Sequence, residues 1–255
     1  MITPTCRERL TAADFDFIIH TLAGGGRRAS ASLAELLTDS DALDTILDSD
    51  ELFRAVLEDG NSINISPQCY FYIILRHVLK EHKLASRETA DYLASLLETF
   101  SRTERMRAPA GAGEGPQQYI SDMLLALQKA APTQSFFLRA HIGNYTLFIT
   151  GVFHDRVECR SRRGGPDVEF FEQVGATNFA VAANHSMARE HSLDRIFQEL
   201  GERFRDIRIA LNDTAGRHMH LEESPQIILH HDRRVDCDRH SDRSVARRNG
   251  QPAEC

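Results

Sequence analysis

Apolar residues recur every three or four positions along most of this chain, and this spacing predicts helices. Within residues 133–151, Leu138, Ile142, Tyr145 and Ile149 are separated by four, three and four positions. A half-buried strand would instead alternate apolar and polar side chains. The pattern therefore predicts an all-α fold, a multi-helix bundle of about eight to nine helices.

Capping residues mark the expected ends of several helices. Thr11 and Asp14 form the T-x-x-D pattern of a helix start, and Gly24 supplies a stop. Ser66 stands directly before Pro67, an order typical of an N-cap followed by the first helical turn. Three further polar residues precede apolar stripes and are predicted N-caps: Ser86, Asp167 and Ser192.

Composition divides the chain into four regions. Residues 1–101 are an N-terminal helical region, and residues 102–117, "RTERMRAPAGAGEGPQ", have the Gly, Ala and Pro content of a linker. A C-terminal helical bundle is expected over 118–213. Residues 214–255 hold few apolar side chains, and this composition predicts a disordered tail.

Two glycines fall on apolar helix faces. Gly143 lies within the helix expected over 133–151, and Gly175 lies within the helix expected over 167–185. A glycine inside a helix costs about 1 kcal/mol relative to alanine, so another advantage is needed to explain it. We expect Gly143 and Gly175 to allow close packing between helices.

Bulk properties narrow the class of partner. The chain has 255 residues and 42% apolar residues, so it can bury a sizeable core. A net charge of −7 disfavours nucleic acid, because binding phosphates requires clustered Lys and Arg. No uninterrupted run of about 18 apolar residues occurs, so no membrane span is expected. The polar N-terminus lacks an apolar leader, and the cytoplasm is the expected location.

Three histidines are candidate ligands for a metal ion or a haem group. His77, His141 and His185 fall on or beside the apolar stripes of different expected helices, and bundles build metal or haem sites from such inward-facing side chains. Together with Asn144 and Tyr145, they would line a ligand pocket, or an active site assembled only in three dimensions. The Glu-x-x-His pairs of di-iron bundles are absent. Each histidine also fits an ordinary hydrogen-bonded core residue, and the identity of any metal or cofactor stays open.

The segment "AHIGNYTLFITGVFHDRVE" and the later "FFEQVGATNFAVAANHSMAREHSLDRIFQELGERFRDIRIALND" resemble the core of a family of all-helical bacterial proteins without known activity. The resemblance covers about residues 118–214, and residues 62–101 more loosely. It implies a bacterial source and a helical fold, and it implies no catalysis. We expect a non-enzymatic interaction or regulatory protein whose partner is a protein, either itself or another. The alternative is a metal- or haem-binding bundle.

Overall fold

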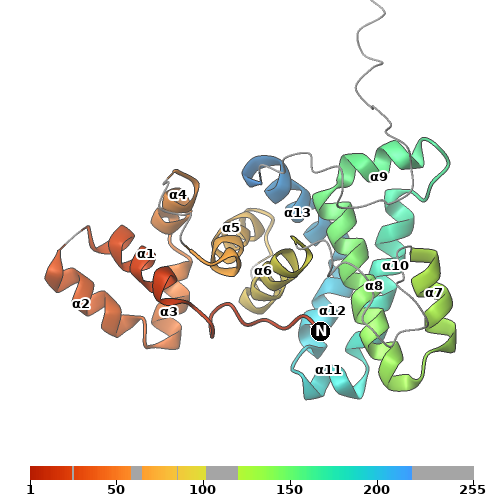
Figure 1. The fold of residues 1–255 in the computed structure, drawn as a ribbon, viewed down its shortest axis with the longest axis horizontal. Coiled ribbons are helices and arrows are strands. Elements are labelled where there is room, and N and C mark those ends of the chain that lie inside the picture. Colours follow the sequence, from red (N-terminus) through yellow and green to blue (C-terminus); the bar gives the residue numbers. More distant parts are fainter. Residues whose placement is uncertain (25, 59–64, 85, 102–119, 220–255) are drawn as a thin grey trace, which may run out of the picture. The chain divides into compact units, whose positions relative to one another are not determined.

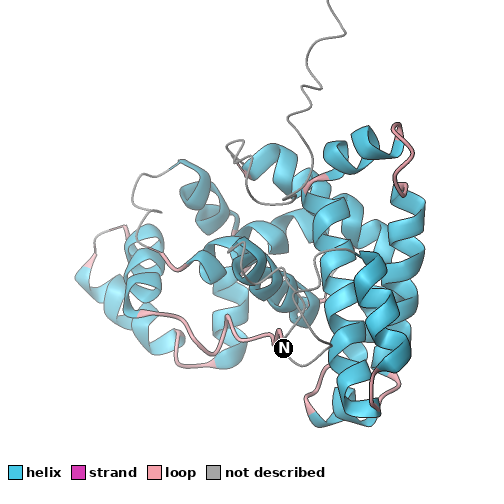
Figure 2. Ribbon diagram, turned by 45° about the vertical axis from the view of Figure 1, so that its right-hand side comes forward, coloured by secondary structure: helices cyan, strands magenta, loops and turns pink. Residues whose placement is uncertain are grey.

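The computed structural model describes residues 1–24, 26–58, 65–84, 86–101 and 120–219. All regular secondary structure in these ranges is helical, as the sequence predicts (Figure 2). The described part contains thirteen helices, more than the expected eight to nine.

The first half contains α1 (Ala12–Ala23), α2 (Arg27–Leu36), α3 (Ser40–Leu47), α4 (Asp50–Glu58), α5 (Pro67–Glu81) and α6 (Arg87–Ser101). The second half contains α7 (Ile120–Lys129), α8 (Pro132–Val152), α9 (His154–Ser161), α10 (Val168–Ala183), α11 (Ser186–Glu190), α12 (Asp194–Glu202) and α13 (Phe204–His218). Figure 1 labels these helices along the chain.

The stretch expected as one helix after Ser192 is divided in two. The chain leaves helical geometry at Arg203, between α12 and α13. The expected cap is also wrong, because Ser192 has a φ of 56° and Leu193 is the N-cap of α12. The break lets Phe204, the first residue of α13, pack against Gly175 of α10. The short helices α9 and α11, which the sequence pattern did not predict, add two more to the number.

Helix α8 is the centre of the second half. Every residue from 140 to 152 is buried, because α8 contacts α10 and α13 along its length and also touches α6, α7 and α9. Figure 1 shows α8 beside α10. A helix that is apolar around most of its circumference is expected in such a buried position.

Two buried carboxylates anchor the N-terminal segment. The backbone N–H of Cys6 donates to Asp91 of α6 at 2.8 Å. Asp14 of α1 accepts from the backbone N–H of Thr11 in the predicted capping box, and its other oxygen accepts from Ser66 N–H at 2.7 Å. Buried carboxylates need such donors because they have given up hydration.

The predicted N-terminal region and C-terminal bundle belong to one compact unit, residues 1–222. Helix α5 packs against α13, and α6 packs against α12 and α8. The expected linker, 102–117, lies outside the described residues, as does the expected tail from residue 220 onward. Helix α13 continues through the buried residues Thr214 and Ala215 to His218, beyond the expected start of that tail. None of the described helices has the length and apolar character needed to cross a membrane.

Candidate functional surface on helix α10

Three of the predicted pocket residues, His141, Asn144 and Tyr145, lie close together in the core as neighbours on α8. His141 is 9% exposed, and its ring centroid lies 5.8 Å from that of Phe100. The Tyr92 hydroxyl donates to Asn144 Oδ1 at 2.8 Å in fully buried surroundings. Burial raises the pKa of Tyr92, so its hydroxyl stays protonated and remains a donor. The Asn144 amide oxygen therefore has a structural partner on α6.

His77 lies at a different place, where α4 meets α5. Its ring stacks on Phe53 with centroids 3.7 Å apart and planes 7° apart. Its Nε2 is 3.5 Å from Glu81 Oε1, one helical turn further along α5. The side chain is 30% exposed, so His77 lies at the edge of the core and not fully inside it.

The sequence pattern predicted that His185 lies on the buried face of the helix that is now α10. The structure places it elsewhere. Helix α10 ends at Ala183, and His185 is the N-cap of α11, where its Nδ1 accepts from the Met187 N–H at 3.2 Å. The half-exposed ring lies 5.2 Å from the ring of Phe136. Within the described ranges, no group of three or more His, Cys, Asp or Glu side chains is arranged to hold a metal ion.

Gly143 and Gly175 both lie where α8 and α10 approach each other. A Cβ on Gly143 would come within 2.8 Å of the Phe179 ring of α10. A Cβ on Gly175 would collide with Thr146 Oγ1 of α8 and with the Phe204 ring of α13. The two glycines thus make room for side chains of the facing helix, rather than contacting each other.

The opposite face of α10 is exposed and uncharged. Phe170, Val174, Thr177 and Val181 are separated by four, three and four positions, so they form one stripe. Phe170 is 37% exposed and Val181 is 44% exposed. No residue from 173 to 184 carries a charged side chain.

Two other sides of α10 pack against α8 and α12. The Phe179 side chain points towards α8. On another side, α12 approaches α10 so closely that a Cβ added to Gly201 would lie 3.1 Å from Ala180 N and 3.2 Å from Ala176 O. The outer stripe was not predicted from the sequence, although the sequence carries a signal for it. Helix α10 carries apolar side chains on two opposite faces, more than a helix with one buried face requires.

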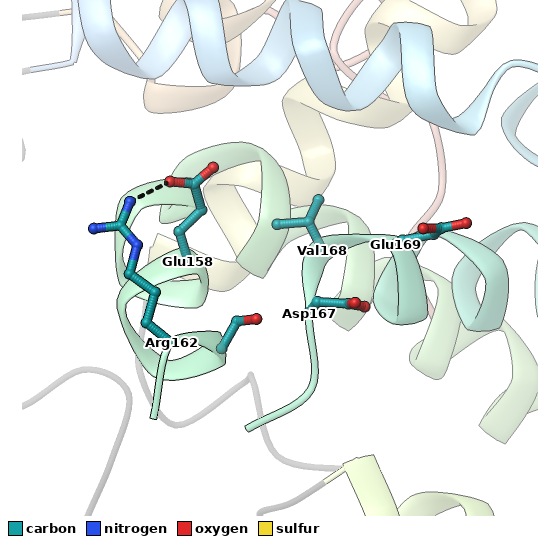
Figure 3. A pocket seen from close by; sticks show the side chains of 6 residues that line it. Glu158, Arg162, Asp167, Val168 and Glu169 are labelled. Carbon is teal, nitrogen blue, oxygen red and sulfur yellow. Dashed lines mark hydrogen bonds and ion pairs between the residues drawn. The ribbon is translucent and has the colours of Figure 1, made fainter. Parts of the chain in front are cut away.

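An open pocket of about 320 Å³ lies at the N-terminal end of the stripe, where α9 and α10 meet (Figure 3). Its lining residues are Glu158, Ser161, Arg162, Asp167, Val168 and Glu169. Arg162 Nη2 donates to Glu158 at 3.3 Å, and Asp167 accepts from the Phe170 N–H as the predicted N-cap of α10. With three carboxylates and one guanidinium, the pocket is suited to a cationic group.

Comparisons of the chain with models of protein families, with curated proteins and with solved structures found no match. The resemblance to a family of helical bacterial proteins therefore stays a prediction. The function has to be inferred from the residues and their geometry alone.

Proposed function

We propose that this chain is a non-enzymatic interaction protein that binds an amphipathic helix of a partner protein on the outer face of α10. The observation that carries the proposal is the uncharged stripe Phe170, Val174, Thr177 and Val181. Its spacing of four, three and four is the pattern with which one helix packs along another. Recognition by an amphipathic helix uses anchors with this spacing.

The acidic pocket beside Phe170 specifies the partner further. Glu158, Asp167 and Glu169 lie around Val168 at the end of the stripe, and Arg162 is the one basic residue among those that line the pocket. A partner helix with a Lys or Arg at the corresponding end would satisfy these carboxylates. Charge complementarity at the rim of an interface contributes mainly to orientation and to the rate of association.

The internal pairing of the predicted site residues also supports a surface role. Asn144 is hydrogen-bonded to Tyr92, and His185 caps α11. His77 stacks on Phe53 at the edge of α5. These side chains serve the fold at three separate places, whereas Phe170, Thr177 and Val181 of the α10 stripe are exposed.

Binding of synthetic helical peptides to the full chain tests the proposal. One peptide carries leucines at heptad spacing and lysines at one end, a second has glutamates in place of those lysines, and a third has the leucines scrambled. We expect saturable binding, measured by fluorescence anisotropy, that is tightest for the first peptide and absent for the scrambled one. The reason is that both the stripe and the acidic pocket must be matched.

Two variants locate the binding surface. Val181→Glu places a charge in the stripe and should abolish binding. Leu125→Glu changes an even more exposed apolar residue on α7, 59% exposed, and should leave binding intact. Equal binding by both variants would contradict the proposal. If the wild-type chain forms a dimer and Val181→Glu dissociates it, the stripe binds a second copy of the chain. This result would contradict the proposal that it binds a helix of a different protein.

The alternative predicted from the sequence, a metal or haem site that uses His77, His141 and His185, stays a prediction. Elemental analysis and an absorption spectrum of the purified protein would test it. A bound metal that is lost in a His141→Ala variant would favour this alternative over the surface role.

A further inference from the structure

A cluster of titratable side chains joins α4, α5 and α13, far along the sequence from the α10 stripe. It contains three of the twelve histidines of the chain, His77, His82 and His218. The carboxylates Asp50, Glu81 and Asp213 and the guanidinium of Arg217 lie among them.

Two of these histidines have carboxylate partners. His77 Nδ1 is 3.6 Å from Asp50 of α4, and its Nε2 is 3.5 Å from Glu81 of α5. His82 Nε2 is 3.0 Å from Asp213 Oδ2 of α13. When protonated, both imidazoles would therefore form ion pairs that tie these helices together.

Arg217 joins the last turn of α13 to α5. Its Nη2 lies 3.0 Å from Glu81 Oε2, and it also contacts Asp213 one turn earlier. The hydrogen bond from Arg217 lowers the pKa of Glu81. The cluster is thus held by charge pairs at its edges.

His218 differs from the other two histidines. Its Nε2 is buried and has no hydrogen-bond partner among the described residues. Its ring meets the edge of Phe53 at 5.5 Å, and its backbone oxygen accepts from the Tyr70 hydroxyl at 3.2 Å. Burial lowers the pKa of His218; the charges of Arg217 and His77 act in the same direction, and Glu81 acts against them.

We propose that the last turn of α13 is a proton-sensitive latch, docked on α4 and α5 while His218 is neutral and released when His218 takes a proton. On protonation, the buried Nε2 of His218 would carry an N–H without a hydrogen-bond partner among the described residues, beside the Arg217 guanidinium, and Glu81 offsets this cost only in part. Burial of an unpaired charge is far more costly than exposure to water, so the turn must open to accept the proton. This inference does not depend on the α10 surface.

The direction of the effect follows from the neutral form being favoured in the docked state. The docking contribution of His218 is fully present above the ordinary histidine pKa of 6.5 and is lost as the pH falls below it. Global stability sums the effects of every titratable group in the chain, so it is a poor measure of the latch. Protection of the backbone amides in the last turn of α13 against hydrogen exchange reports on His218 more directly.

Hydrogen–deuterium exchange on the full chain provides this measurement, at about pH 8 and about pH 5.5, on either side of the histidine pKa. After correction for intrinsic exchange, we expect protection of amides 214–218 to fall several-fold at the lower pH, while that of α8 stays high. His218→Phe keeps a ring against Phe53 but cannot be protonated, so it should remove the pH response. His191→Phe, at an exposed histidine on the C-cap of α11, should retain it.

Equal protection of the last turn at both pH values in the wild-type chain would overturn the proposal, and so would an unchanged pH response in His218→Phe. A second measurement applies if that variant fails to fold. In an NMR titration of the wild-type imidazole, a midpoint below 6.5 is the expected result, and a midpoint at or above this value overturns the latch.

Discussion

Gly143 of α8 lies so close to Phe179 of α10 that a Cβ on the glycine would stand 2.8 Å from two carbons of the ring. The ring is fully buried and also contacts Phe197, so it has little room to move. We predict that Gly143→Ala destabilises the protein, because overpacking of about 1–3 kcal/mol exceeds the gain in helix propensity of about 1 kcal/mol. Urea denaturation would measure the difference.

Gly216→Ala on α13 is the matched control. Among the described residues, no atom apart from the adjacent residues and the backbone of the same helix lies within 4 Å of the Cβ position there, and the residue is exposed. We expect a gain of about 0.5–1 kcal/mol from helix propensity alone. If both alanine variants shifted the urea midpoint in the same direction, close packing would not be the reason for Gly143.

The Tyr92–Asn144 hydrogen bond should contribute to stability. Tyr92→Phe removes the donor and leaves a buried amide oxygen without it, which costs about 1–3 kcal/mol. A double-mutant cycle with Asn144→Ala would separate this interaction from the loss of packing. Strictly additive effects would show that the two side chains do not stabilise each other.

Asp48 should make the stability of the fold dependent on pH in the acid range. Arg76 Nε and Nη2 donate to its two oxygens at 2.7 and 2.8 Å. Burial alone would raise the pKa of Asp48, but Arg76 and Lys80 outweigh this effect and lower it to about 2. The contribution is therefore complete above the ordinary value of 3.8 and is lost as the pH falls towards about 2.

Asp48→Asn tests this contribution. The variant should be less stable than the wild type at neutral pH, and the difference should shrink below pH 3.8. Urea midpoints measured across this range provide the comparison. A difference that is independent of pH would show that the Asp48 charge has no part in stability.

The thiol of Cys6 should be unreactive in the folded protein. It is 2% exposed, and Cys69, also buried, lies beside it. The Cys69 thiol and burial raise the pKa of Cys6, and the negative charges of Asp91 and Asp14 add to this effect. Because the thiolate is the reactive form, we expect iodoacetamide to modify Cys6 only after unfolding, as peptide mass spectrometry would show. Rapid modification in native buffer would contradict this burial.

Helix starts that depend on near neighbours could be predicted from the sequence. Thr11, Ser66 and Asp167 are N-caps, and Gly24 adopts the left-handed conformation expected of a C-cap. Each of these signals acts within three or four residues. The break at Arg203 could not be predicted in this way, because it depends on Phe204 reaching Gly175, a residue nearly thirty positions earlier.

The candidate site shows the same limit. Periodicity located the apolar faces of α8 and α10, but it could not tell which apolar residues are enclosed. Val181 and Phe179 look alike in the sequence, yet one is 44% exposed and the other is fully buried. His185 was expected to continue the α10 stripe, although the chain turns just before it, at Asn184. Which side of a helix is covered depends on its neighbours in space.

The enclosure of residues 140–152 of α8 limits how the chain can be shortened. A helical segment that has no solvent-exposed face does not fold in isolation. Any stable fragment that contains it must also contain the helices that cover it. Those helices come from both sides of residues 102–119 in the sequence: α6 precedes this segment, and α10 and α13 follow it. The most obvious place to cut the sequence would therefore separate α8 from part of its cover, and the two pieces should regain solubility only when produced together.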